Sequence, residues 1–165
     1  MSGDYRILVA IDLKAGTDRL LAETQRFAKA LNAIVDIIHV ADPDPFIGYI
    51  KSHDPDDQSV IDSEREPRAR AMRTEHRDTQ TVATKLRDAG VRVDQALMIQ
   101  GPTLEMILEE VGKLGTDLLI LGSHHHGPLH RLWFGDTAAD AAKKAPCALL
   151  VVPLEAESGL PQSAA

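Results

Sequence analysis

The sequence contains a single cysteine, Cys147, and this scarcity excludes two kinds of architecture. One thiol cannot form a disulfide within the chain, and it cannot supply the several sulfur ligands of a cysteine-based metal cage. Its position at the start of an apolar run favours a buried, inert thiol. With 165 residues, of which 44% are apolar, the chain is large enough to bury a core as a single domain.

Long apolar segments and a basic surface are missing as well. No apolar run approaches membrane-spanning length, and the first residues lack the charged start and apolar stretch of a signal peptide. We therefore expect a cytoplasmic protein. The formal net charge is -7. Because phosphate backbones and anionic membranes attract clustered Lys and Arg, we expect neither nucleic acid nor a membrane as a partner.

No arrangement typical of a catalytic site is present either. Ser123 and His124 are adjacent, but they lack the sequence of a nucleophile elbow, and the chain has no Gly-x-x-x-x-Gly-Lys-Ser/Thr loop. Lys143 and Lys144 lie far along the last predicted helix. The sequence therefore predicts a protein that is not an enzyme.

Short apolar runs alternate along the chain with segments of helical periodicity. The runs predict strands at 7–11, 33–40, 91–99, 118–121 and 147–152, with helices between them. The strand at 91–99 alternates in part, which is typical of a position nearer the sheet edge. Strand, helix, strand is the right-handed crossover unit of parallel sheets. The order therefore predicts an α/β fold, a five-stranded parallel sheet with helices on both faces.

Caps and breaks set the expected boundaries of these elements. Thr17 and Thr103 are predicted N-caps, while Gly90 and Gly115 are predicted helix ends.

Between residues 42 and 67 the periodicity fails among four prolines and many aspartates, which predicts a long acidic loop. Such a loop can be functional, although simple mobility is the commoner explanation. Residues 154–165 have no core-forming pattern, so the domain is expected to span 1–153 with a flexible tail.

Glycines mark the carboxyl end of the strand predicted at 118–121. Gly122 and Gly127 bracket the following loop, and Gly135-Asp136-Thr137 opens an Ala-rich helical segment. Ligands bind at this end of open α/β sheets, where Gly allows close approach and a helix amino terminus offers N–H donors to an anion.

This stretch resembles the phosphate-binding end of the universal stress protein family, and the resemblance covers roughly residues 4–153. Nucleotide-binding members of the family carry Gly-x-x-Gly, nine residues, then Gly followed by Ser or Thr. Gly122 and Gly135 match this pattern, whereas His125 replaces the second Gly and Asp136 replaces the Ser or Thr.

The resemblance implies a strand order of 3-2-1-4-5, with an adenine nucleotide, ATP or AMP, in the crevice between strands 1 and 4. Asp12 matches the family residue at the nucleoside end, and Val40 matches the residue whose backbone contacts adenine. The expected site residues are Ala10, Asp12, Val40, Leu121, Gly122, Ser123, His125, Gly127, Gly135, Asp136 and Thr137. From the residues alone, Asp12 could instead cap its own turn, and each glycine could serve only a tight turn.

The departures from the family pattern oppose phosphate binding. His125 adds a side chain where the backbone has to come close, and Asp136 caps the helix while repelling a phosphate. Thr137 could restore a hydroxyl one residue later. The neighbouring run His124 to His126 lacks the convergent geometry and further ligands of a metal centre, so no metal is expected beyond Mg²⁺ accompanying ATP.

Assembly and function follow from these features as expectations. The strand at 147–152 comes last and is expected at a sheet edge, where universal stress proteins commonly pair, so we expect a homodimer. Two functions remain open, and an enzyme with weak ATP hydrolysis ranks well below both. One is a stress-response module that binds an adenine nucleotide, favoured by Asp12, Gly122 and Gly135. The other is a nucleotide-independent dimeric interaction protein, favoured by His125 and Asp136.

Overall fold

The computed structural model describes residues 3–41, 58–124 and 136–154. The described elements are β1 (Arg6–Ile11), α1 (Thr17–Leu31), β2 (Ile34–Ala41), α3 (Gln58–Asp88), β3 (Arg92–Gln100), α4 (Thr103–Leu114), β4 (Leu118–His124), α6 (Asp136–Lys144) and β5 (Ala148–Leu154). The strands form one five-stranded sheet in the order β3-β2-β1-β4-β5. Every neighbouring pair is parallel, which confirms the predicted fold.

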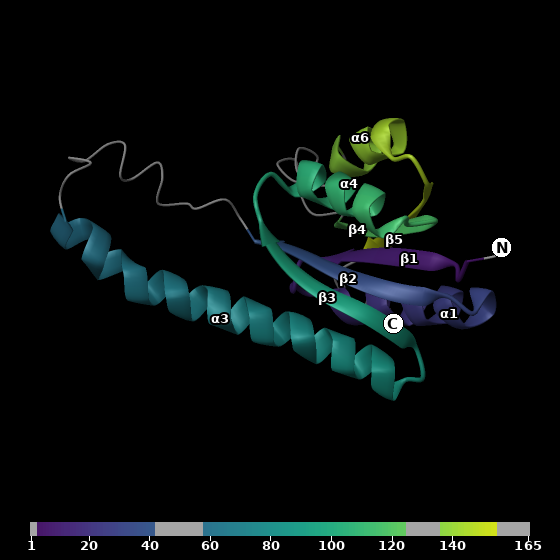
Figure 1. The fold of residues 1–165 in the computed structure, drawn as a ribbon, viewed down its shortest axis with the longest axis horizontal. Helices are drawn as coiled ribbons and strands as arrows, with labels where there is room; N and C mark the ends of the chain where they lie inside the picture. The colour runs from purple at the N-terminus through teal and green to yellow at the C-terminus, as the bar shows by residue number, and fades with distance from the viewer. Residues whose placement is uncertain (1–2, 42–57, 125–135, 155–165) are drawn as a thin grey trace, which may run out of the picture.

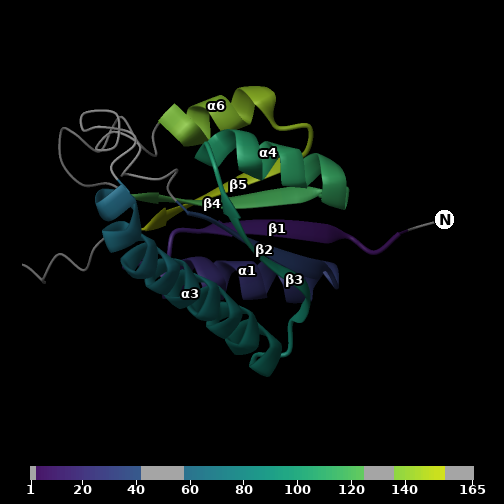
Figure 2. The ribbon, with the colours of Figure 1, turned by 60° about the vertical axis from the view of Figure 1, so that its left-hand side comes forward.

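The sheet separates two helical layers. Helices α1 and α3 cover one face, and α4 and α6 cover the other (Figure 1; Figure 2). Because successive strand residues point to opposite faces, Ile7 and Val9 pack with the α1 and α3 layer, while Leu8 between them packs with α4 and α6. All three side chains are fully buried. This burial on both faces is the reason that β1 reads as an uninterrupted apolar run.

A bulge in β3 faces a buried polar residue, Asp36, near the amino-terminal ends of the strands. The pairing register runs from Val35 with Val93 to Ile37 with Ala96, so two β3 residues face Asp36. Asp36 is fully buried, and Arg6 donates to its carboxylate through Nε at 3.1 Å and Nη2 at 2.9 Å. Burial raises the pKa of Asp36, and Arg6 partly offsets that rise.

Helix α3 is longer than predicted. It begins at Gln58 and contains Pro67, so the expectation of a loop is wrong for residues 58–67, while residues 42–57 lie outside the described part. Proline suggested a break because it lacks an N–H and crowds the preceding turn. The residues around it are mostly Glu, Arg and Ala, which favour helix. With 31 residues α3 is about 46 Å long, and its amino-terminal half projects beyond the sheet (Figure 1).

The predicted N-caps are wrong, whereas the predicted helix ends are confirmed. Gly16 and Pro102 occupy the N-cap positions of α1 and α4 without a side-chain cap. Thr17 Oγ1 instead donates to the carbonyl of Lys14 at 2.7 Å. Gly115 ends α4 with φ 63°, and Gly90 follows α3 with φ 83°. Both glycines adopt the left-handed conformation that side chains disfavour.

The carboxyl-terminal strand also differs from its prediction. It begins at Ala148, and Cys147 precedes it in a partly buried position where burial raises the pKa of the thiol. It ends at Leu154, which is only 2% exposed and therefore belongs to the core rather than to a tail. Residues 155–165 lie outside the described part. Among the described residues, no helix combines the length and the apolar character needed to cross a membrane.

Candidate functional site

The topology brings the carboxyl ends of β1, β2 and β4 together at one edge. Winding reverses at β1, because β2 and β3 lie on one side of it and β4 and β5 on the other. Ala10 pairs with Leu121 of β4, and Ile11 pairs with His39 of β2. Asp12 and Val40 therefore follow at adjacent strand ends. This is the position at which open α/β sheets bind ligands.

Asp12 organises the turn that leaves β1. Its Oδ1 accepts a hydrogen bond from the Lys14 backbone N–H at 3.0 Å, and Leu13 between them has φ 59°. This contact is the turn-capping role that the sequence left open for Asp12. The same turn holds the partly buried carboxylate at the switch point of the sheet. Whether the carboxylate also binds a nucleoside stays a prediction.

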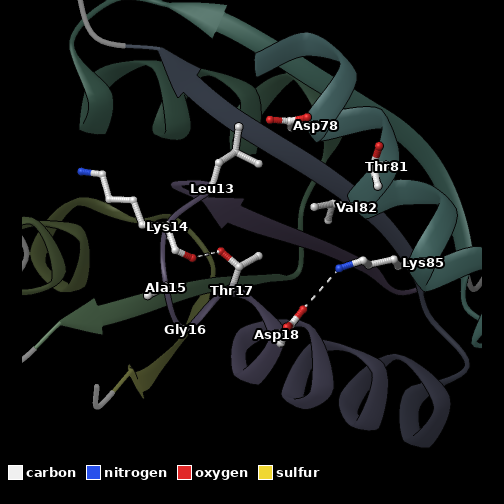
Figure 3. Close-up of a pocket in the computed structure, with 10 residues that line it drawn as sticks. All are labelled: Leu13, Lys14, Ala15, Gly16, Thr17, Asp18, Asp78, Thr81, Val82 and Lys85. Atoms are coloured by element: carbon white, nitrogen blue, oxygen red, sulfur yellow. Dashed lines mark hydrogen bonds and ion pairs between the residues drawn. The ribbon is translucent and has the colours of Figure 1, made fainter. Parts of the chain in front are cut away.

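A cavity of about 320 Å³ lies between the same turn and α3 (Figure 3). Residues 13–18 line one wall, and α3 supplies Asp78, Thr81, Val82 and Lys85. Lys85 Nζ lies 3.5 Å from Asp18 Oδ1 across the cavity, whereas Lys14 points away from it. The charged side chains directed at the cavity are therefore Asp18, Asp78 and Lys85, and Asp18 and Lys85 pair with each other.

Gly122 has a packing role that the sequence did not reveal. It is buried in β4, and a Cβ built on it would lie 2.3 Å from Leu154 Cδ1. Leu154 also contacts Gly16, where an added Cβ would lie 3.0 Å from Leu154 Cβ. The Leu154 side chain thus packs against both glycines. A side chain at position 122 would require Leu154 to shift, so close packing favours glycine there independently of any ligand.

The remaining predicted site residues are only partly placed. Ser123 is half-buried and pairs with Pro153 of β5. The backbone of Asp136 and Thr137 forms the first turn of α6, so this helix start lies where the sequence predicted it. His125, Gly127 and Gly135 lie outside the described residues. The structure therefore brings Ala10, Asp12, Val40, Leu121 and Gly122 together, and the roles of all eleven residues stay predictions.

Comparison with known proteins decides the family. The sequence pattern of the Universal stress protein family matches residues 5–153. The chain belongs to this family. Over 146 residues it is 27% identical to Universal stress protein A homolog 1 of Coxiella burnetii, which covers 88% of this chain and 94% of that protein.

Solved structures of similar fold include other universal stress proteins. The hypothetical protein MJ0577 has a TM-score of 0.67 and 22% identity, over 90% of this chain and 95% of the other. A universal stress protein in complex with cAMP has a TM-score of 0.60 and 16% identity, over 92% and 98%. One from Archaeoglobus fulgidus in complex with dAMP has a TM-score of 0.57 and 15% identity, over 90% and 97%.

Proposed function

We propose that this universal stress protein is a regulatory, non-catalytic module of the stress response that binds an adenine nucleotide, ATP or AMP. The observation that supports the proposal is the position of Asp12 and Val40 at adjacent strand ends beside the switch point. The complexes of similar proteins with cAMP and dAMP support an adenine nucleotide as the ligand class.

In the proposed complex, the nucleoside lies near Asp12 and Val40. A carboxylate there accepts hydrogen bonds from the adenine amino group or from ribose hydroxyls. The phosphates extend towards the first turn of α6, whose free N–H groups and helix dipole attract an anion. A helix terminus contributes about 0.3 to 1 kcal/mol to an exposed anion. The carboxylate of Asp136 in that turn opposes this attraction, and each added phosphate increases the opposition.

A second candidate function is supported by a separate observation. Packing against Leu154 already gives a reason for glycine at position 122. Gly122 is therefore not, by itself, evidence for phosphate binding. A dimeric interaction protein that works without nucleotide is therefore the alternative. In either case we propose a homodimer formed through β5, which lies at an edge of the sheet.

Calorimetric titration of ATP and AMP into three proteins separates the candidates: the wild type, Asp136→Ser, and the double variant His125→Gly with Asp136→Ser. We expect wild type to prefer ATP over AMP only slightly. ATP binding should tighten in Asp136→Ser and tighten further in the double variant, which restores backbone access and a hydroxyl donor.

Two results would contradict this proposal. Nanomolar ATP binding by wild type that stays unchanged in both variants would show that these positions do not control affinity. An absence of binding in wild type, with recovery in the double variant, would favour the nucleotide-independent function.

A further inference from the structure

The cavity between the turn after β1 and helix α3 has the size and the mixed lining of a small-molecule site (Figure 3). Its volume of about 320 Å³ lies at the lower end of the range for such sites. Leu13, Ala15 and the buried Val82 give it an apolar part. The cavity lies on the α1 and α3 side of the sheet, whereas α6, where the phosphates of the proposed nucleotide would lie, covers the opposite face (Figure 2). It is therefore a separate location.

The hydroxyl groups that line this cavity have only acceptor capacity left. Thr17 Oγ1 donates its hydrogen to the carbonyl oxygen of Lys14 at 2.7 Å, and Thr81 Oγ1 donates to the carbonyl oxygen of Arg77 at 3.0 Å. A hydroxyl has one hydrogen and two lone pairs, so each oxygen can still accept a hydrogen bond. Both threonines therefore favour a ligand that donates.

The charged side chains of the cavity favour a cation. Asp18 on α1 and Asp78 on α3 supply carboxylates from opposite walls, and Lys85 supplies one ammonium group, 3.5 Å from Asp18. Arg77 Nε lies 3.6 Å from Asp78 Oδ1, on an exposed side chain, and such surface pairs are weak. Two carboxylates against one ammonium group leave an excess of one negative charge inside the cavity.

The start of α1 also borders the cavity, and the N–H groups of a first helical turn attract anions. Asp18 lies in that first turn, where its carboxylate offsets the partial positive charge of the helix terminus. Lys14, the basic residue of the preceding turn, points away from the cavity (Figure 3). An anion would thus approach two carboxylates, whereas a cation that donates hydrogen bonds would meet carboxylate and hydroxyl oxygens.

We propose that this cavity binds a small organic cation, an aliphatic amine. Its ammonium group donates to Asp78 and Thr81, which are three residues apart and therefore neighbours on one face of α3. Its hydrocarbon part packs on Leu13 and Val82. An ammonium group has three N–H donors and no acceptor, which matches the acceptors of the two walls. The site uses neither Asp12 nor the first turn of α6.

Titration of the isotope-labelled full chain with butylamine, butyrate and butanol tests the proposal. The three probes share a short alkyl chain and differ in the charge of their head group. We expect butylamine to bind with a Kd of about 1 mM, as suits a ligand of so few atoms, and to shift the amide resonances of residues 13–18 and 78–85. Butyrate and butanol should each bind about tenfold more weakly, because neither supplies a charged donor.

Three variants give changes of different sign. Asp78→Asn should weaken butylamine binding about tenfold, since a charge-assisted hydrogen bond becomes a neutral one. Lys85→Met should strengthen it about threefold, because it removes the ammonium group that competes for Asp18. Lys14→Met is the matched control. It removes the same charge from a side chain that points away, so the Kd should not change. Thermal melting confirms that each variant is folded.

Three results would overturn the amine site. The first is binding of butyrate or butanol as tight as that of butylamine, which would show that the head group is not recognised. The second is an equal gain in Lys14→Met and Lys85→Met, since binding would then follow net charge alone. The third is an unchanged Kd in Asp78→Asn.

Discussion

Near the amino-terminal ends of the strands, Arg6 pairs with the buried carboxylate of Asp36. Arg6 is the basic residue that donates to the buried Asp36, and it also donates to Asp94 at 2.6 Å. The Gln95 backbone N–H donates to the same Asp36 carboxylate at 3.2 Å. A buried ion pair adds little net stability, but removal of one partner leaves an uncompensated charge. Replacement of Arg6 alone should therefore cost more stability than the ion pair itself contributes.

Replacement of Arg6 by Leu should destabilise the protein by about 3 kcal/mol at pH 7, the lower end of the range for breaking a buried pair. The loss should shrink as pH falls. Without Arg6 the pKa of Asp36 rises further, because the hydrogen bonds and the charge that lowered it are gone. The folded variant then binds a proton that the unfolded chain does not, and this stabilises it towards acid. Urea unfolding at pH 7 and pH 5 measures both effects.

Asp94→Asn is the matched control, because its carboxylate is half exposed and contacts the same arginine. We expect it to cost less than about 1 kcal/mol, as exposed ion pairs do. An Arg6→Leu loss as small as that of Asp94→Asn, or one that grows at pH 5, would contradict the interpretation of Asp36 as the buried charge.

Among the elements, β4, β5 and α1 meet at one apolar side chain. Leu154 extends from the end of β5 to Gly122 in β4 and to Gly16 at the start of α1. The packing is close enough that a side chain at position 122 would force Leu154 to shift. The packing around Gly122 is thus determined by contacts between elements, independently of any ligand.

Gly122→Ala should destabilise the protein by about 1 to 3 kcal/mol, the usual cost of overpacking a core. The cost should fall in the Leu154→Ala background by about 0.5 to 3 kcal/mol, since the colliding atoms are absent there. A double-mutant cycle measured by urea unfolding gives this coupling. Additive losses would show that Leu154 is not what restricts position 122.

Gly112 provides the control for glycine replacement itself. It lies exposed within α4, and an added Cβ would meet no atom within 4 Å. Gly112→Ala should stabilise the protein by about 0.4 to 1 kcal/mol, because alanine restricts the unfolded chain and favours helix.

At the scale of the whole molecule, β5 presents a sheet edge with an apolar residue. Val151 is 36% exposed, and among the strands that the structure describes β5 has a neighbour on one side only. Unpaired backbone groups on such an edge invite a partner strand. The proposed dimer would cover this edge with a second copy.

Light scattering should therefore give twice the chain mass of 18.0 kDa. Val151→Lys should shift the protein to monomer, because a charged side chain on an edge strand opposes pairing. Leu31→Lys is the control, since Leu31 is 42% exposed at the far end of α1 and should leave the mass unchanged. A concentration-independent wild-type monomer would remove the dimer.

The order and type of the elements were determined by the sequence alone, because periodicity and apolar runs are local properties of the chain. Residues 7–11 read as a buried strand without any knowledge of their neighbours. The start of α3 was not readable in the same way, since the helix formers around Pro67 outweigh a local break signal. The strand order came from family resemblance, and the fold confirms it.

The contacts within the site were decided only by the tertiary structure. Sequence placed Asp12 and Val40 at strand ends, but their adjacency required the pairing of β1 with β2. Leu154 looked like part of a tail, and its contacts with Gly16 and Gly122 join distant parts of the chain. Asp18 and Lys85 pair although 67 residues separate them in the sequence. No spacing in the sequence predicts such pairs, because they depend on how the helices pack on the completed sheet.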